Sequence, residues 1–273
     1  MRLGFGLYRY MLHDDYYAFA RQCGATDVIV HLCDYGVKST AAEEEANQPV
    51  GDTKGWGVSD HPGIWSLDEV LRIRDELRRH DLNLFAVENF DPAQWYDVLL
   101  AGPKRAEQLE QAKEQLRVFA EAGVEVFGYN FSLTGVTGRA NLTTRGGAPT
   151  VGLDGTTEQL DAPLPRSMVW NMEYDPSAEG FHAPITEDEL WDRVSVFLRG
   201  LLPVAEECGI KLAAHPDDPP LARVHRQPKL VYRHHLYQKL LDISASPSNC
   251  LELCVGTLAE MDDDDLYGSI ERY

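Results

Sequence analysis

The chain has 273 residues, 44% hydrophobic and 25% charged, and its 44 Asp and Glu residues outnumber 25 Lys and Arg residues, so the formal net charge is −19. This composition is typical of a soluble globular protein with one large domain, and the negative charge argues against nucleic acid or an anionic membrane as a partner. No apolar run reaches the roughly 18 residues of a membrane span, and no signal peptide is evident, so we expect a cytoplasmic protein. The number of cysteines, five, is odd and no CxxC motif is present, so we expect reduced thiols.

Short apolar runs in the first part of the chain predict strands that alternate with helices. Residues 3–7 predict a first strand, and Asp14 can cap the helix that follows it. Residues 26–32 contain consecutive β-branched residues, which is typical of a strand buried on both faces in a parallel sheet. A helix begins at Ser66 with the capping-box sequence SLDE and leads to a third strand at 83–89.

The same alternation continues in the rest of the chain. A helix over 103–122 precedes a fourth strand at 124–131. A second capping box, TEDE, starts a helix at Thr186, which leads to a strand over 211–215, and a sixth strand is expected at 249–256. The order helix, glycine, strand occurs three times and indicates right-handed βαβ winding.

Two long polar segments interrupt this pattern. Residues 33–62 and 132–185 both exceed the roughly 12–15 residues of an ordinary connection, and such segments are usually functional or disordered. The second segment contains no clear apolar period. We therefore expect it to be a long loop excursion within a single domain that covers residues 1–273.

Polar side chains stand where the predicted strands end, which is where both (β/α)8 barrels and doubly wound sheets place their ligands. No GxGxxG motif follows the first strand, so a dinucleotide-binding site is not expected. These strand-end residues are His31, Glu88, Asn89, Asn130, His215 and Cys254.

His215 and Cys254 are the candidate metal ligands. His215 ends a strand and begins the stiff turn HPDDPP, where Pro216 has no N–H for further strand pairing. An imidazole and a thiolate suit a divalent ion such as zinc, iron or manganese. Each residue alone could equally be structural, the histidine as a hydrogen-bonded side chain and the cysteine as a small buried one. A further helix is expected over 229–243, and its two histidines, His234 and His235, are expected at the surface.

Other polar residues are candidates for substrate binding. A carboxylate or amide at a strand end can hold a substrate hydroxyl, and an arginine in the long excursion can clamp a carboxylate. Each of these residues could instead have a structural role: the acid could cap the next turn, the amide could form hydrogen bonds with the loop backbone, and the arginine could be exposed to solvent. Asp217 can also orient the neighbouring histidine. The candidates are His31, Glu88, Asn130, Arg139 and Asp217. The catalytic acid and base are not assigned.

Several segments resemble the bacterial mannonate dehydratases. The most specific is HPDDPP, within the run FLRGLLPVAEECGIKLAAHPDDPP at 197–220. The cysteine segment SPSNCLELCVGTL at 246–258 is the next most specific. Two further segments are IWSLDEVLRIRDELRRHDL at 64–82 and VFGYNF at 126–131. The resemblance is scattered over most of the chain.

This resemblance implies an α/β fold of the xylose isomerase-like TIM (β/α)8-barrel type. It implies that His215 and Cys254 bind a divalent metal, usually Mn²⁺, with Fe²⁺ or another divalent ion as alternatives. It further implies a hydro-lyase of hexuronate catabolism that removes water from D-mannonate to give 2-keto-3-deoxy-D-gluconate. We expect a small-molecule sugar acid as substrate and a homo-oligomer.

The sequence departs from the family pattern at several places. The family continues with two further strands that supply another His and an Asp to the metal, whereas this sequence stops at Tyr273. We therefore expect an incomplete barrel of about six strands, with the remaining ligands beyond Tyr273. Two alternatives stay open: an isomerase or epimerase of the same superfamily, and an inactive truncated barrel that acts as a binding or assembly protein.

Overall fold

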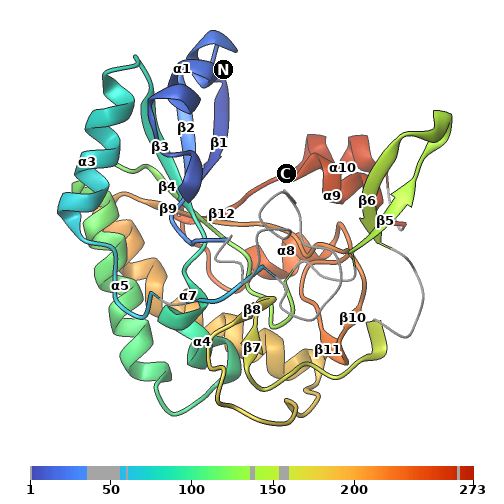
Figure 1. Cartoon of the computed structure of the whole chain (residues 1–273). Coiled ribbons are helices and arrows are strands. Elements are labelled where there is room, and N and C mark those ends of the chain that lie inside the picture. The colour runs from blue at the N-terminus through green and yellow to red at the C-terminus, as the bar shows by residue number, and fades with distance from the viewer. Residues whose placement is uncertain (1, 36–55, 60, 136–138, 154–159, 263–264) are drawn as a thin grey trace.

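Six parallel strands form one sheet in a computed structural model that describes residues 2–35, 56–59, 61–135, 139–153, 160–262 and 265–273. The strands follow one another along the sheet in chain order (Figure 1). They are β1 (Gly4–Tyr8), β2 (Asp27–His31), β3 (Asn83–Glu88), β4 (Val126–Tyr129), β9 (Lys211–Ala214) and β12 (Asn249–Leu251). All six predicted strands are confirmed, although the last one ends earlier than expected.

The sheet is the incomplete barrel that the sequence predicts. Within the described residues, β1 and β12 are its two edges and do not pair with each other, so the barrel is open. The parallel register brings the carboxyl ends of neighbouring strands to the same level. Tyr8 pairs with His31, His31 pairs with Glu88, and Tyr129 pairs with Ala214. Residues that end these strands therefore share one edge.

Helices cover the outer face of the sheet. Three of them, α3, α5 and α7, lie side by side (Figure 1). Large side chains between the helices and strands form the core, where the ring centroids of Phe119 and Phe127 are 5.7 Å apart and those of Tyr129 and Phe197 are 5.1 Å apart. The helices are α1 (Asp14–Gln22), α3 (Leu67–Arg78), α4 (Pro92–Leu100), α5 (Arg105–Glu121), α7 (Glu187–Cys208), α8 (Leu236–Leu241), α9 (Val255–Glu260) and α10 (Leu266–Arg272). None of the described helices is long and apolar enough to cross a membrane.

The predicted helix caps account for two of these boundaries. The Ser66 hydroxyl accepts from the backbone N–H of Glu69 at 3.2 Å at the start of α3. At the start of α7 the box is complete, since Thr186 accepts from the N–H of Glu189 at 3.2 Å and the Glu189 carboxylate accepts from the N–H of Thr186 at 2.7 Å. Gly209 ends α7 with a φ of 73°, a left-handed conformation that favours glycine.

Two helical predictions differ from the structure. The helix expected over 229–243 is limited to α8, and His234 before it is buried rather than exposed, with Nε2 2.9 Å from the Leu258 carbonyl and Nδ1 2.7 Å from the Ser269 hydroxyl. Helix α4 was not predicted, although Pro92 at its first turn and Asp91 as its cap are ordinary start signals.

Short hairpins occupy the described parts of the long excursion and of the chain after β9. They do not join the main sheet. The pairs are β5 (Arg139–Thr143) with β6 (Pro149–Leu153), β7 (Met168–Val169) with β8 (Met172–Glu173), and β10 (Arg223–Val224) with β11 (Gln227–Pro228). Short 3-10 turns lie at Arg9–Met11 and Arg145–Gly147. The single-domain assignment with an excursion at 132–185 stays a prediction.

The capping box of α7 gives the first testable prediction. Thr186→Ala removes the acceptor for the Glu189 N–H, and we expect it to lower the free energy of unfolding by about 1 kcal/mol in a denaturant titration. Thr186→Ser keeps the hydroxyl and should match the parent. Equal stability of the Ala variant and the parent would show that this cap does not stabilise the fold.

Candidate functional site

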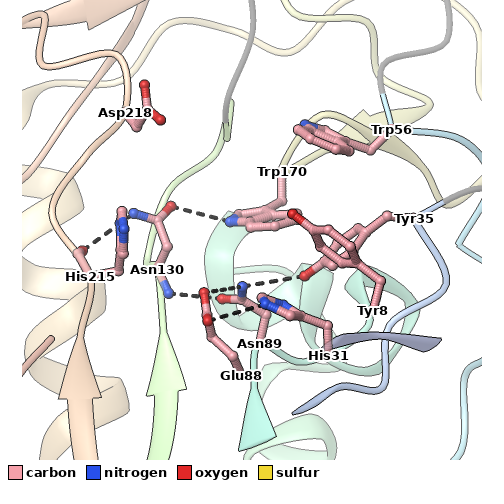
Figure 2. Close-up of a pocket in the computed structure, with 10 residues that line it drawn as sticks. All are labelled: Tyr8, His31, Tyr35, Trp56, Glu88, Asn89, Asn130, Trp170, His215 and Asp218. Atoms are coloured by element: carbon pink, nitrogen blue, oxygen red, sulfur yellow. Dashed lines mark hydrogen bonds and ion pairs between the residues drawn. The ribbon is translucent and has the colours of Figure 1, made fainter. Parts of the chain in front are cut away.

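A pocket lies at the edge of the sheet where the parallel strands end (Figure 2). Residues at the ends of β1, β2, β3, β4 and β9 line it, together with residues from loops. The lining residues are Tyr8, His31, Tyr35, Trp56, Glu88, Asn89, Asn130, Trp170, His215 and Asp218. Five side chains singled out in the sequence therefore meet in one pocket, and these are His31, Glu88, Asn89, Asn130 and His215.

His215 directly follows β9, and the backbone fixes the orientation of its ring. Its N–H donates to the Tyr129 carbonyl at 2.8 Å, and its Nδ1 lies 2.7 Å from the Pro216 carbonyl oxygen. Because a carbonyl only accepts, Nδ1 carries a hydrogen and Nε2 is the nitrogen left for Cys254. Burial lowers the pKa of His215, but the hydrogen bond with Cys254 and two nearby carboxylates outweigh burial and raise this pKa to about 10.

Cys254 lies just beyond the sixth strand and caps α9. Its Sγ accepts from the backbone N–H of Thr257 at 3.5 Å and from the Thr257 hydroxyl at 3.2 Å. The hydrogen bond with His215 is the main reason that its pKa falls to about 7, with burial acting in the opposite direction. The contact thus favours an imidazolium–thiolate pair, because it raises the pKa of His215 and lowers that of Cys254.

This pair brings two metal-binding side chains into contact. Imidazole nitrogen and thiolate sulfur are both common ligands of divalent ions, and a ring whose Nδ1 donates to a backbone carbonyl has its Nε2 oriented for a metal. Within the described parts of the chain, no group of three or more His, Cys, Asp or Glu side chains is arranged to hold a metal ion. The described residues therefore provide two candidate metal donors, His215 and Cys254.

Two carboxylates lie beside the His215–Cys254 pair. Glu88 ends β3, and its Oε2 is 3.4 Å from His31 Nε2. The pKa of His31 is lowered, because the effect of burial exceeds the opposing effect of the Glu88 charge. Burial and the charge of Glu88 raise the pKa of Glu252, which the sequence analysis did not single out, to about 8. Gly128 leaves room for both acids, since a Cβ there would lie 2.8 Å from Glu252 Oε2 and 2.9 Å from Glu88 Cγ.

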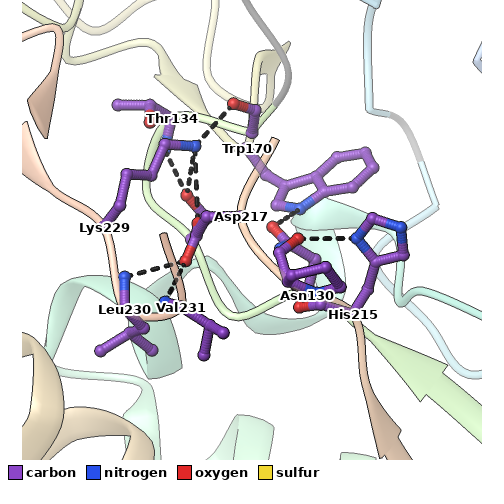
Figure 3. Close-up of polar contacts among 11 residues, drawn as sticks. Asn130, Thr134, Trp170, His215, Asp217, Lys229, Leu230 and Val231 are labelled. Carbon is purple, nitrogen blue, oxygen red and sulfur yellow. Dashed lines mark hydrogen bonds and ion pairs between the residues drawn. The ribbon is translucent and has the colours of Figure 1, made fainter. Parts of the chain in front are cut away.

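Asn130 connects the two walls of the pocket. Its Oδ1 accepts from Trp170 Nε1 at 3.1 Å, and its Nδ2 donates to the Pro216 carbonyl at 3.2 Å and to the His215 carbonyl at 3.4 Å (Figure 3). Its backbone N–H donates to Asn89 Oδ1 at 3.1 Å. The amide is thus used within the protein, and the role of Asn130 in substrate binding stays a prediction.

An aromatic wall faces the polar side chains across the pocket. We use this name for Tyr8, Tyr35, Trp56 and Trp170, which Figure 2 shows on the side opposite His215. The ring of Tyr35 lies 5.8 Å from that of Tyr8, 5.7 Å from that of Trp56 and 5.6 Å from that of Trp170. This wall was not predicted from the sequence, although Tyr35 and Trp56 stand in the first of the two long polar segments.

Two predicted substrate-binding residues are not among the lining residues. Asp217 is 2% exposed, and its Oδ2 accepts from the N–H groups of Leu230 and Val231, both at 2.8 Å. Its neighbour Asp218 lines the pocket instead. Arg139 begins β5, and its side chain lies outside the described part of the structure. Substrate contacts by Asp217 and Arg139 stay predictions.

Comparison with curated proteins shows similarity to mannonate dehydratases. The Geobacillus thermodenitrificans mannonate dehydratase is 30% identical over 222 residues, which cover 74% of this chain and 58% of that protein. The Shouchella clausii mannonate dehydratase is 27% identical over 260 residues, which cover 88% of this chain and 72% of that protein. The chain spans 58% and 63% of the length of the first two curated relatives that it matches.

Solved structures show the same fold. The mannonate dehydratase of Streptococcus suis serotype 2 superposes with a TM-score of 0.70 at 21% identity, covering 100% of this chain and 68% of that one. A D-psicose 3-epimerase superposes with a TM-score of 0.51 at 11% identity, covering 91% of this chain and 61% of that one. At these identities the likeness concerns the fold alone, and it confirms the predicted α/β fold of the (β/α)8-barrel type.

A family model also matches most of the chain. The model described as D-mannonate dehydratase (UxuA) matches residues 28–273, which include all but the first of the six strands and every predicted site residue. The match confirms the resemblance that HPDDPP and the cysteine segment indicate. The chain belongs to the D-mannonate dehydratase (UxuA) family.

Proposed function

We propose that this chain is a metal-dependent hydro-lyase that converts D-mannonate to 2-keto-3-deoxy-D-gluconate and water. The contact between His215 and Cys254 carries the proposal, because it joins a nitrogen and a thiolate sulfur at the carboxyl edge of a parallel sheet. Membership of the D-mannonate dehydratase family supports the choice of substrate.

His215 Nε2 and Cys254 Sγ would hold a divalent ion, and we propose Mn²⁺. The donor chemistry fits, since the ring is oriented through Nδ1 and the thiol is readily deprotonated. When bound, such an ion supplies Lewis-acid stabilisation of the negative charge that develops on the substrate. Two donors leave positions for further ligands.

Dehydration requires two proton transfers. A base removes the proton on C2, next to the carboxylate, and an acid protonates the hydroxyl that leaves C3 as water. The resulting enol becomes the C2 ketone when C3 takes up a proton. These steps need a sugar acid that is held in one orientation with bulk water excluded.

The pocket side chains can supply that orientation. We assign Glu88 and His31 to the substrate hydroxyls, since they lie together at the floor of the pocket. The aromatic wall excludes water and packs against the carbon chain. Arg139 remains our proposal for the substrate carboxylate, and Asp217 our proposal for a contact from the HPDDPP turn.

We also propose a cytoplasmic location and a homo-oligomeric state. All five cysteines are unpaired, which suits a reducing compartment. The edge strands β1 and β12 lack a second strand partner among the described residues, and pairing between chains can cover such edges.

The metal assignment predicts the behaviour of two variants. His215→Ala and Cys254→Ala each remove one of the two donors, and we expect each to abolish retention of Mn²⁺ in elemental analysis of the purified protein. Cys250→Ala is the matched control, because the Cys250 thiol contacts the Pro247 carbonyl and is not among the pocket-lining residues. Retention of the metal by either donor variant at the parent level would refute the assignment.

The imidazolium–thiolate pair predicts a titration in the metal-free protein. Because the contact with His215 lowers the pKa of Cys254 to about 7, its thiolate should appear in ultraviolet absorbance as the pH rises through about 7. His215→Gln removes the positive charge and should move this transition to higher pH, while Cys254→Ser should abolish it. An unchanged transition in the Gln variant would show that the two side chains do not interact.

The reaction itself is tested by incubation with D-mannonate and Mn²⁺. We expect formation of a 2-keto-3-deoxy acid, measured by its reaction with a keto-acid reagent, and loss of this product with His215→Ala. A product with the formula of the substrate would instead indicate an isomerase or epimerase. Bound metal without either product would contradict D-mannonate as the substrate.

A further inference from the structure

Lys229 is a fully buried lysine behind the pocket. Its Nζ donates to the Ser132 hydroxyl at 3.1 Å and to the Gly135 carbonyl at 2.9 Å, and it lies 3.5 Å from Asp217 Oδ1 (Figure 3). An ammonium group has three N–H donors, and three oxygens surround this one. A buried charge is stable only where it is paired and hydrogen-bonded, and Lys229 meets both conditions.

Asp217 connects this ammonium to the turn that carries His215. Its Oδ2 accepts from the N–H groups of Leu230 and Val231, and its own N–H donates to the Val231 carbonyl at 2.9 Å. The turn is thereby held against the segment that contains Lys229. His215 lies two residues before Asp217, so this attachment holds the turn that directly follows His215.

The two hydrogen bonds of Lys229 are made to the loop that supports the aromatic wall. Ser132 and Gly135 belong to the loop after β4, and the Leu133 carbonyl in that loop accepts from the N–H of Trp170 at 2.8 Å. Gly135 packs closely beneath Trp170, because a Cβ there would lie 2.8 Å from the Trp170 carbonyl carbon and oxygen. The loop therefore sets the place of Trp170.

We propose that Lys229 is a positioning residue that fixes the separation between the turn carrying His215 and the loop supporting Trp170. This proposal rests on the proposed function, because His215 and Trp170 lie on opposite walls of the pocket assigned to the substrate. The ammonium contacts both supports at once, through the ion pair with Asp217 and the hydrogen bonds to Ser132 and Gly135. Asn130 forms a second link, between the turn and the indole of Trp170. An apolar side chain of similar length can fill the space, but it cannot hold the two supports together.

The test compares Lys229→Met with a variant in which both charges are removed, Asp217→Asn with Lys229→Met. Mn²⁺ affinity, amide hydrogen exchange and Tm are measured on the full chain. Replacing a group that supports a metal ligand typically weakens metal binding about 10- to 100-fold, and we expect a loss in that range for Lys229→Met. We also expect faster exchange at the amides of Asp217 and Trp170, and a Tm lower by roughly 10 °C because an unpaired carboxylate remains buried.

The double variant separates positioning from stability. Without a buried unpaired charge its Tm should recover toward the parent, whereas the Trp170 amide should still exchange faster, since the bonds to the loop are still missing. If Lys229→Met does not fold, the exchange measurement on the double variant still tests the proposal. Lys211→Met is the matched control, because the exposed Lys211 bonds the Pro247 carbonyl at the opposite end of β9.

The outcomes distinguish this proposal from the proposed function. If the double variant keeps parent-level exchange at the Trp170 amide, Lys229 is a structural residue only and the proposal is overturned. If the parent binds no Mn²⁺, the proposed function fails, while the exchange of this amide still decides whether Lys229 holds the two walls.

Discussion

The parallel pairing of β9 with β12 is the constraint on which the site depends. Ala214 pairs with Leu251, so the chain leaves both strands at the same level. His215 follows at once on one strand, and the three residues that end in Cys254 return the thiol toward its ring on the other. A slip of one residue in this register would turn one of the two side chains to the other face of the sheet. The contact is therefore a consequence of strand pairing rather than of loop flexibility.

Much of the fold was predictable because its signals are local. Consecutive apolar residues predicted the six strands, and Thr186 with Glu189 predicted the start of α7 from four residues of sequence. His215 was found because a proline-rich turn after a strand is unusual. The place of Cys254 was predicted less well: the strand ends at Leu251, and the cysteine caps a short helix, since its sulfur accepts from the residue three positions later.

The missed parts of the site depend on contacts between distant segments. A lysine in a sequence is usually a surface residue, and the burial of Lys229 is explained only by contacts with distant residues such as Ser132, 97 positions away. Glu252 lies in an ordinary strand-like run, LEL, and becomes notable only through the space above Gly128 that it shares with a carboxylate from β3. The aromatic wall likewise combines residues from the first strand and from two long loops, and no spacing rule connects them.

The charge of the pocket suits the proposed cation. The carboxylates of Glu88 and Asp218 line the pocket, and Glu252 lies close by, where burial and the charge of Glu88 raise its pKa. In the metal-free chain the imidazolium of His215 is the positive charge that offsets them. A divalent ion between His215 and Cys254 would take over this role with twice the charge. It would also reduce the repulsion of an anionic sugar acid by these carboxylates, so the binding of metal and of substrate should strengthen each other by reciprocal linkage.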